Sequence, residues 1–251
     1  MHKKIIQLIC ILLFTATCSS QESRIYIYQG KFNSSFGRGD NTRIFEGRLI
    51  VQGERSLFTM KEEGIHEHGL QGNTLNLRPD SMFTVYKDHA SQTMLFEFSD
   101  FNQRSHWYAD TMFPMQWQLI AEEKMIGGIP CSKAVGFFKG RGYTAWYAPS
   151  VANSDGPWKL GGLPGMILEA YDDHDDWHLT WVSTMESQKS FDDGFFQRKI
   201  NHDLQGFNGY ASYVKKMFSR LQASMAAQSN AGCVGCQTVP QLKINAWEKI
   251  D

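Results

Sequence analysis

The sequence predicts a mainly β fold: a single antiparallel sheet domain with one α-helix in its C-terminal region. Runs of β-branched, aromatic and alternating residues recur along the chain, bounded by Gly, Asp, Asn or Pro. Short loops join neighbouring runs, and no helical pattern lies between them as parallel strands would require. The predicted strands cover residues 24–28, 43–51, 56–60, 82–86, 93–98, 117–125, 131–138, 143–147, 166–171 and 177–183.

Three connections between these runs have the composition of tight turns. Gly127 and Gly128 form the first, and Lys139-Gly140-Arg141-Gly142 forms the second. The third is the acidic segment 172–176. We expect three antiparallel hairpins at these places. The acidic segment does not follow the order of an EF-hand calcium loop, and a solvated hairpin tip needs no ion.

A helix is predicted at about 208–228. From Tyr210 onward, apolar residues recur every three or four positions, and the pattern stops near Ser229 and Asn230. We expect the apolar stripe to pack on one face of the sheet, within a single domain that spans 21–228. The apolar positions are Val214, Met217, Phe218 and Leu221, opposite the charged Lys215, Lys216 and Arg220.

The most distinctive segment carries two turns between residues 147 and 166. In the second turn, Pro presets φ and the following Gly accepts a positive φ, which predicts a type II turn. The residues favour a rigid double turn that returns the chain into the sheet. The alternative is one wall of a binding site with two Trp as aromatic surfaces. The candidate residues are Trp146, Gly156, Pro157, Trp158, Gly162, Leu163, Pro164 and Gly165.

A set of motifs in this region resembles the GLPGLI family of exported Bacteroidetes proteins. The motifs are the segments 122–126, 131–134, 140–147, 155–157 and 162–167, with Met166 where the family usually has Leu. The resemblance implies an envelope location and a curved antiparallel sheet, a half-barrel wrapped around a helix as in lipoprotein carriers. It implies no catalytic or binding residues. Family members accompany outer-membrane import systems, which suggests a role in transport support.

The first twenty residues have the layout of a secretory signal peptide. Lys3 and Lys4 precede an apolar run over 5–16, and small residues follow through Ser20. The run is too short to span a bilayer. We therefore expect an exported protein of the periplasm or the outer membrane. Association with the membrane is expected only if Cys18 is lipidated, because cleavage near Ser20 would remove it.

Two cysteines lie in the tail over 229–251, in the order Cys233-Val234-Gly235-Cys236. An exported protein meets oxidising conditions, so a local disulfide between Cys233 and Cys236 is the favoured interpretation. A redox site or half of a metal site are the alternatives. The sequence supplies no second C-x-x-C for a four-thiolate zinc site.

A second candidate for metal binding is formed by His66 and His68. Two His at this spacing lie on the same side of an extended segment, where they can share a Cu or Zn ion. Two ligands fall short of the three or four that such sites require, so a polar loop is the favoured interpretation.

The motif search favours a non-enzymatic protein. We find no G-x-S-x-G elbow, H-E-x-x-H pair or P-loop, and the net charge of -1 comes without a basic run that would indicate nucleic-acid binding. No cofactor is expected. The leading prediction is an exported ligand-binding or transport-accessory protein, with a small hydrophobic ligand or an outer-membrane import system as partner. Metal handling and a structural or partner-docking role are the alternatives.

Overall fold

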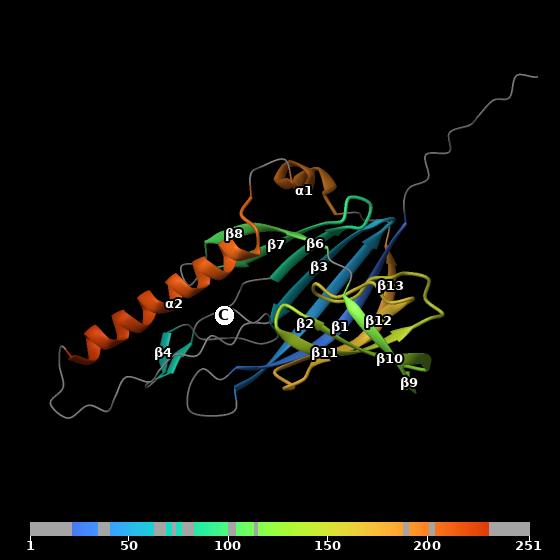
Figure 1. Cartoon of the computed structure of the whole chain (residues 1–251), viewed down its shortest axis with the longest axis horizontal. Coiled ribbons are helices and arrows are strands. Elements are labelled where there is room, and N and C mark those ends of the chain that lie inside the picture. The colour runs from blue at the N-terminus through green and yellow to red at the C-terminus, as the bar shows by residue number, and fades with distance from the viewer. Residues whose placement is uncertain are drawn as a thin grey trace, which may run out of the picture.

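The computed structural model describes residues 22–34, 41–62, 69–71, 74–76, 83–99, 104–112, 115–187, 191–200 and 204–230. Eleven strands form one open antiparallel sheet in the order β8-β7-β6-β3-β2-β1-β13-β12-β11-β10-β9, and β4 pairs with β5 separately. Two helices follow the last strand (Figure 1). The mainly β class, the curved antiparallel sheet and the C-terminal helix are thereby confirmed.

The elements follow the predicted runs closely, with some additions. Strand β8 and helix α1 are elements that the sequence patterns did not predict, as are the short strands β4 and β5. The strands are β1 (Ser23–Ser34), β2 (Asn41–Gln52), β3 (Arg55–Glu62), β4 (Gly69–Gln71), β5 (Thr74–Asn76), β6 (Phe83–Asp88), β7 (Thr93–Ser99), β8 (Ser105–Thr111), β9 (Gln116–Ile126), β10 (Ile129–Phe138), β11 (Arg141–Ala148), β12 (Met166–Asp172) and β13 (Trp177–Ser187). The helices are α1 (Asp193–Ile200) and α2 (Phe207–Asn230).

The three predicted hairpins are confirmed at the β9–β10, β10–β11 and β12–β13 connections. Gly127 and Gly128 have φ of 54° and 83°, and Lys139 and Gly140 have 46° and 80°. Two consecutive residues with positive φ match the twist of the flanking strands, as in two-residue hairpin turns.

Three β-bulges bend the sheet. The pairing shifts between Ser132 and Lys133 on β10, between Trp146 and Tyr147 on β11, and between Ile27 and Tyr28 on β1. Ser132 pairs with Tyr147, so the first two shifts are neighbours across the sheet. Because a bulge bends its strand and increases the local twist, neighbouring bulges act together as a line of curvature.

The segment 149–165, which connects β11 to β12, lies inside the curve and is called the crossover loop below. Lys87 of β6 donates to the carbonyl of Leu160 at 3.0 Å, and Trp117 Nε1 of β9 donates to the carbonyl of Gly161 at 2.9 Å. Strand β9 is at one end of the sheet order, and β6 is the third strand from the other end. Both can reach adjacent residues of one loop only because the sheet curves around it.

The helices cover the two faces of the sheet near β8. Tyr210 of α2 packs on Phe96 and Tyr108, with centroid distances of 5.2 and 5.5 Å, as part of the main core. Phe196 of α1 stacks on Tyr86 at 4.5 Å in a separate apolar cluster. Tyr86 and Lys87 are consecutive strand residues, so α1 lies on the face opposite the crossover loop.

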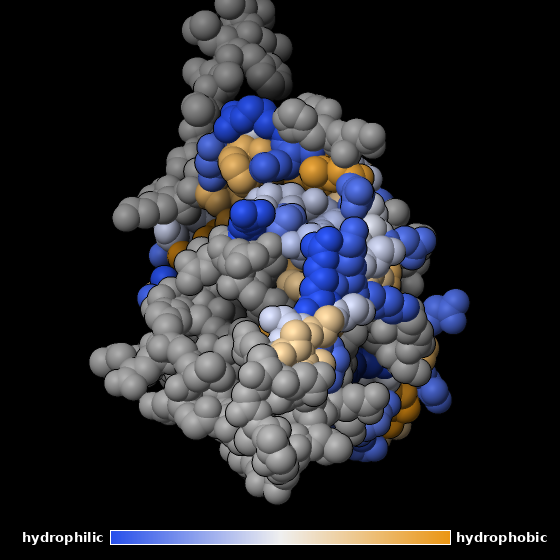
Figure 2. All heavy atoms as spheres, turned by 90° about the vertical axis from the view of Figure 1, so that its left-hand side faces the viewer, coloured by the Kyte–Doolittle hydropathy of each residue, from blue (hydrophilic) through white to orange (hydrophobic). Residues whose placement is uncertain are grey.

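The outward side of α2 is polar. Lys215, Lys216, Ser219 and Arg220 are exposed, while Val214 is buried. Figure 2 views the molecule from this end and shows hydrophilic side chains over much of the described surface, with smaller apolar areas between them. None of the described helices is long and apolar enough to cross a membrane.

Candidate functional site

A buried ion pair fixes the crossover loop to the sheet. Lys87 is 1 % exposed and Asp155 is fully buried, and their side chains form a short hydrogen-bonded ion pair. The Lys87 ammonium also donates to the carbonyls of Gly156, at 2.8 Å, and Leu160, so its three hydrogens all have acceptors. Asp155 accepts from the backbone N–H of Gly156 at 2.7 Å, and His89 Nε2 lies 3.1 Å from its other oxygen.

The charges of this centre depend on one another. Burial lowers the pKa of the Lys87 ammonium, and the attraction of Asp155 opposes that effect. Burial alone would raise the pKa of Asp155, but Lys87 and His89 together hold it well below its usual range. All three hydrogens of the ammonium and both oxygens of the carboxylate have partners, so the pair positions the loop.

The first predicted turn, at Gly156 and Pro157, continues into a strained residue. Leu160 donates its N–H to the carbonyl of Pro157 at 3.1 Å, and Trp158 within this turn has φ of 54°. Positive φ is costly for a bulky side chain. The strain is offset by packing, because Trp158 is 2 % exposed and contacts Phe138, Tyr143 and Trp177.

The second turn differs from the predicted type II turn. Gly165 donates to the carbonyl of Leu163 at 2.8 Å across Pro164, which is a three-residue γ-turn at the start of a strand. The φ of Gly165 is 151°, and a Cβ there would lie 2.2 Å from the carbonyl oxygen of Ala148. Gly is therefore required at position 165 because β11 approaches closely, and not because of a four-residue turn. Gly162 also has a positive φ, 83°, but open space around it.

The two candidate Trp residues lie on opposite faces of the sheet. Trp158 packs on Tyr143, which faces the concave side. Trp146 follows Tyr143 by three residues along β11, and no bulge lies between the two. Alternation therefore turns Trp146 to the convex face. There Lys124 lies 4.4 Å from its ring centroid, and Glu169 pairs with Lys124 and with His178. The structure does not bring Trp146 and Trp158 into one aromatic wall.

The acidic hairpin tip is held by its own contacts. The carboxylate of Asp172 pairs with Arg141 and accepts from the backbone N–H groups of Asp176, at 2.7 Å, and Trp177, at 3.2 Å. Asp172, Asp173 and His174 offer ligand atoms close together, but Asp172 is already engaged in closing the turn. This is the pattern of a structural turn.

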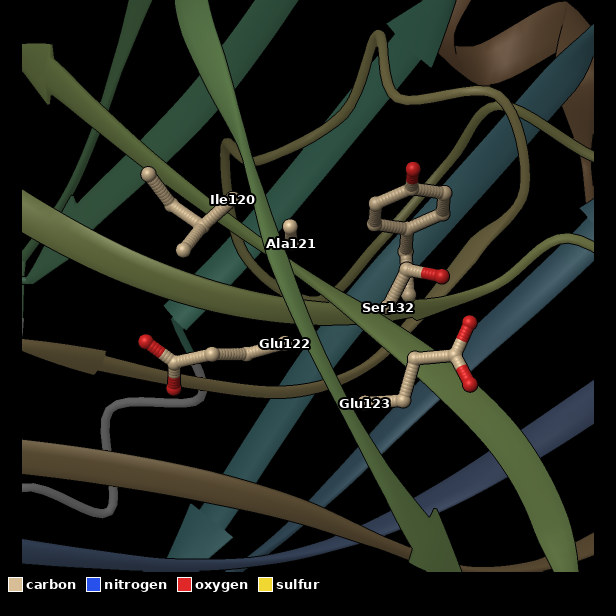
Figure 3. A pocket seen from close by; sticks show the side chains of 6 residues that line it. Ile120, Ala121, Glu122, Glu123 and Ser132 are labelled. Atoms are coloured by element: carbon tan, nitrogen blue, oxygen red, sulfur yellow. The ribbon is translucent and has the colours of Figure 1, made fainter.

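The bulge on β9 opens a hollow on the molecular surface. Glu123 pairs with Ser132 and Ile120 pairs with Lys133, so the two β9 residues between them have no partners on β10. The hollow measures about 540 Å³ (Figure 3). Glu122 and Glu123 point to opposite sides of β9 in this view. Its lining residues are Ile120, Ala121, Glu122, Glu123, Ser132 and Tyr147.

One further cysteine, Cys131, lies within the described residues, and the other candidate residues lie outside them. Cys131 is 1 % exposed, and burial raises its pKa to about 11, which makes it a poor nucleophile. His66, His68, Cys233 and Cys236 lie outside the described residues, as do Cys18 and the predicted signal peptide. Metal binding and the tail disulfide stay predictions.

Sequence patterns did not single out Lys87 or His89, and they treated Asp155 only as a turn residue. On β6, Lys87 lies on the same face as Val85 and Phe83, which face the core. A charged residue at a core-facing position was the available signal. Its partner is 68 positions away in the sequence, so only the folded chain identifies the pair.

Comparison with known families gives one match. The model of a family described as a protein of unknown function, Porph_ging, matches residues 138–169. This range contains the crossover loop, the buried Asp155 and the motif at 162–167. No curated protein matches the sequence significantly.

Solved structures give distant likenesses. Two crystal forms of PNGF-II align with TM-scores of 0.44 and 0.46 at 15% identity, over 69% and 78% of this chain. The chain spans about a third of PNGF-II, at 30% and 33% of its length.

Proposed function

We propose that this chain is an exported, non-enzymatic accessory protein of the GLPGLI family that binds a partner protein by strand addition along β9. The motif set supports the family, and the match to a family of unknown function falls on a segment that carries three of those motifs. The envelope location rests on the signal-peptide pattern and the resemblance.

The observation that carries the docking role is the difference between the two ends of the sheet. At the β8 end, Ala109 donates its N–H to the carbonyl of Gln205, and α2 packs beside the strand. At the other end, β9 is eleven residues long and pairs, among the described residues, with β10 alone. An uncovered edge of this length offers a row of backbone donors and acceptors to an extended partner.

Side chains on β9 favour contact with a protein surface. Leu119 and Met125 are 58 % and 62 % exposed, although both are apolar. Exposed apolar side chains beside an open strand edge favour burial by a partner. By contrast, the aromatic Trp158 and Trp177 of the concave face pack on one another, so the surfaces that a small-ligand carrier would use are part of the core.

The experiment uses photocross-linking in the bacterial envelope. A benzophenone amino acid replaces Leu119 or Met125 on β9, or Val182 or Met185 on β13 as exposed apolar controls. We expect one common adduct from both β9 positions and none from the β13 positions. Adducts of equal yield from all four positions would contradict docking at β9.

A pair of proline variants tests the strand-addition geometry. Consecutive residues of an edge strand direct their N–H groups alternately toward the neighbouring strand and away from it. Of Gln118→Pro and Leu119→Pro, one therefore removes a hydrogen bond to β10, and the other removes only a donor that points outward. The variant that lacks only the outward donor is recognised because it keeps the wild-type unfolding midpoint. We expect it to lose the β9 adduct, and an unchanged adduct would refute strand addition.

A further inference from the structure

We infer that the hollow at the β9 bulge is a specificity pocket for a lysine or arginine side chain of the docking strand. The inference rests on the proposed function and adds the chemistry of the partner. It follows from the position of the hollow, from its unused polar groups and from its charge.

The position of the hollow is set by the interruption of β9. Regular pairing with β10 covers 116–120 and 123–126, and the bulge lies between the two stretches. A partner strand that adds to the first stretch reaches the bulge, where its backbone loses the regular ladder and a side chain can enter the hollow. The interruption also disfavours continuous pairing of β9 with β9 of a second copy.

The polar groups that line the hollow are unused. The side chains of Glu123, Ser132 and Tyr147 make no hydrogen bond or ion pair with any described residue, whereas Glu122 pairs with Lys133 at 2.9 Å. In Figure 3 the Glu123 carboxylate and the Ser132 hydroxyl are turned to the same side. The four oxygens of these three side chains, which can accept hydrogen bonds, and one aromatic ring therefore share the hollow.

The charge of the hollow selects a cation. Lys124 and Lys133, the lysines of β9 and β10, are engaged by Glu169 and Glu122. Glu123 is thus left as an unneutralised carboxylate. A basic side chain would donate a charge-assisted hydrogen bond to Glu123 and make a cation–π contact with Tyr147, and an anion would do neither.

The test measures peptide binding by fluorescence anisotropy with the full chain. The probes are two labelled, acetylated seven-residue peptides of alternating Thr and Val that carry Lys or norleucine at the central position. We expect wild-type protein to bind the Lys peptide about tenfold or more tightly than the norleucine peptide. Glu123→Gln should abolish this preference. Glu186→Gln, which changes an exposed carboxylate on β13 outside the hollow, should retain it.

Three results would overturn the inference. If both peptides bind equally and the folded proline variant abolishes this binding, strand addition stands and the specificity pocket is rejected. No binding of either peptide would also reject the pocket, and the cross-linking at β9 would then decide the proposed function separately. A dimer in solution that the same proline variant dissociates would show that a second copy covers β9.

Discussion

At the residue scale, stability depends most on positions whose surroundings accept no other side chain. The Lys87 ammonium and the Asp155 carboxylate are both buried, and each satisfies the other. Removing one partner leaves the other charged and desolvated, which costs far more than the loss of a surface ion pair. Gly165 is constrained differently, because the backbone of β11 occupies the space that a side chain would need.

Asp155→Asn should destabilise the protein by about 3–5 kcal/mol at pH 7, because it leaves the Lys87 ammonium buried without a counter-charge. The folded-state pKa of Asp155 is lowered, so its contribution is complete above the unfolded pKa of about 4 and is lost as pH falls through the lower folded value. The difference between wild type and variant in urea unfolding should therefore shrink below about pH 4.

The matched control for that variant is Glu122→Gln, which removes one partner of the exposed pair with Lys133. It should change the stability by less than about 1 kcal/mol. A loss as large as that of Asp155→Asn, or an Asp155→Asn effect that is the same at pH 2.5 and pH 7, would contradict the assignment.

Comparing Gly165→Ala with Gly162→Ala distinguishes the cost of backbone strain at positive φ from the cost of a steric clash with a new Cβ. Both positions have positive φ, and the strain alone costs about 1 kcal/mol. Only at Gly165 would the new Cβ also meet backbone, at 2.2 Å from Ala148. We expect a clearly larger fall in the thermal unfolding midpoint for Gly165→Ala, and equal falls would show that the approach of β11 is not what requires Gly.

At the scale of elements, α1 and α2 stabilise the same end of the sheet from its two faces. Helix α1 has only eight residues and is too short to be stable by itself, so its structure depends on packing against Tyr86 and Trp107. Helix α2 contributes Tyr210 to the main core. Together they cover both faces beside β8 and leave β9 as the uncovered end.

Phe196→Ala should release α1 while leaving the sheet folded. The substitution removes the stacking partner of Tyr86 and costs about 3–5 kcal/mol. Hydrogen exchange should accelerate across 193–200 more than in β1 or β2. Arg198→Ala, at a position of the same helix whose side chain is 70 % exposed, is the control and should have a small effect. Equal acceleration in both variants would rule out Phe196 as the anchor.

For the whole molecule, curvature and an open edge are the properties that bear on function. The bulges curve the sheet, and the crossover loop fills the inside of the curve near Lys87 and Trp117. Because this part of the interior is used for packing, we propose the β9 edge, and not the concave face, as the binding surface. The cross-linking and peptide experiments above test this assignment at the scale of the molecule.

The sequence by itself determined the fold class, the hairpins and the C-terminal helix, because alternation, turn residues and helical spacing are local properties. Local patterns failed for α1 and β8, which have only eight and seven residues. They also gave a type II turn where Gly165 instead makes a γ-turn against β11.

Tertiary structure decided the candidate sites. The pairing of Lys87 with Asp155 and the separation of Trp146 from Trp158 depend on which faces distant strands present. The hollow at Glu123 depends on a shift in register between two strands. The physical reason is that a residue's neighbours across a sheet are set by register and curvature, which arise from the packing of the whole chain.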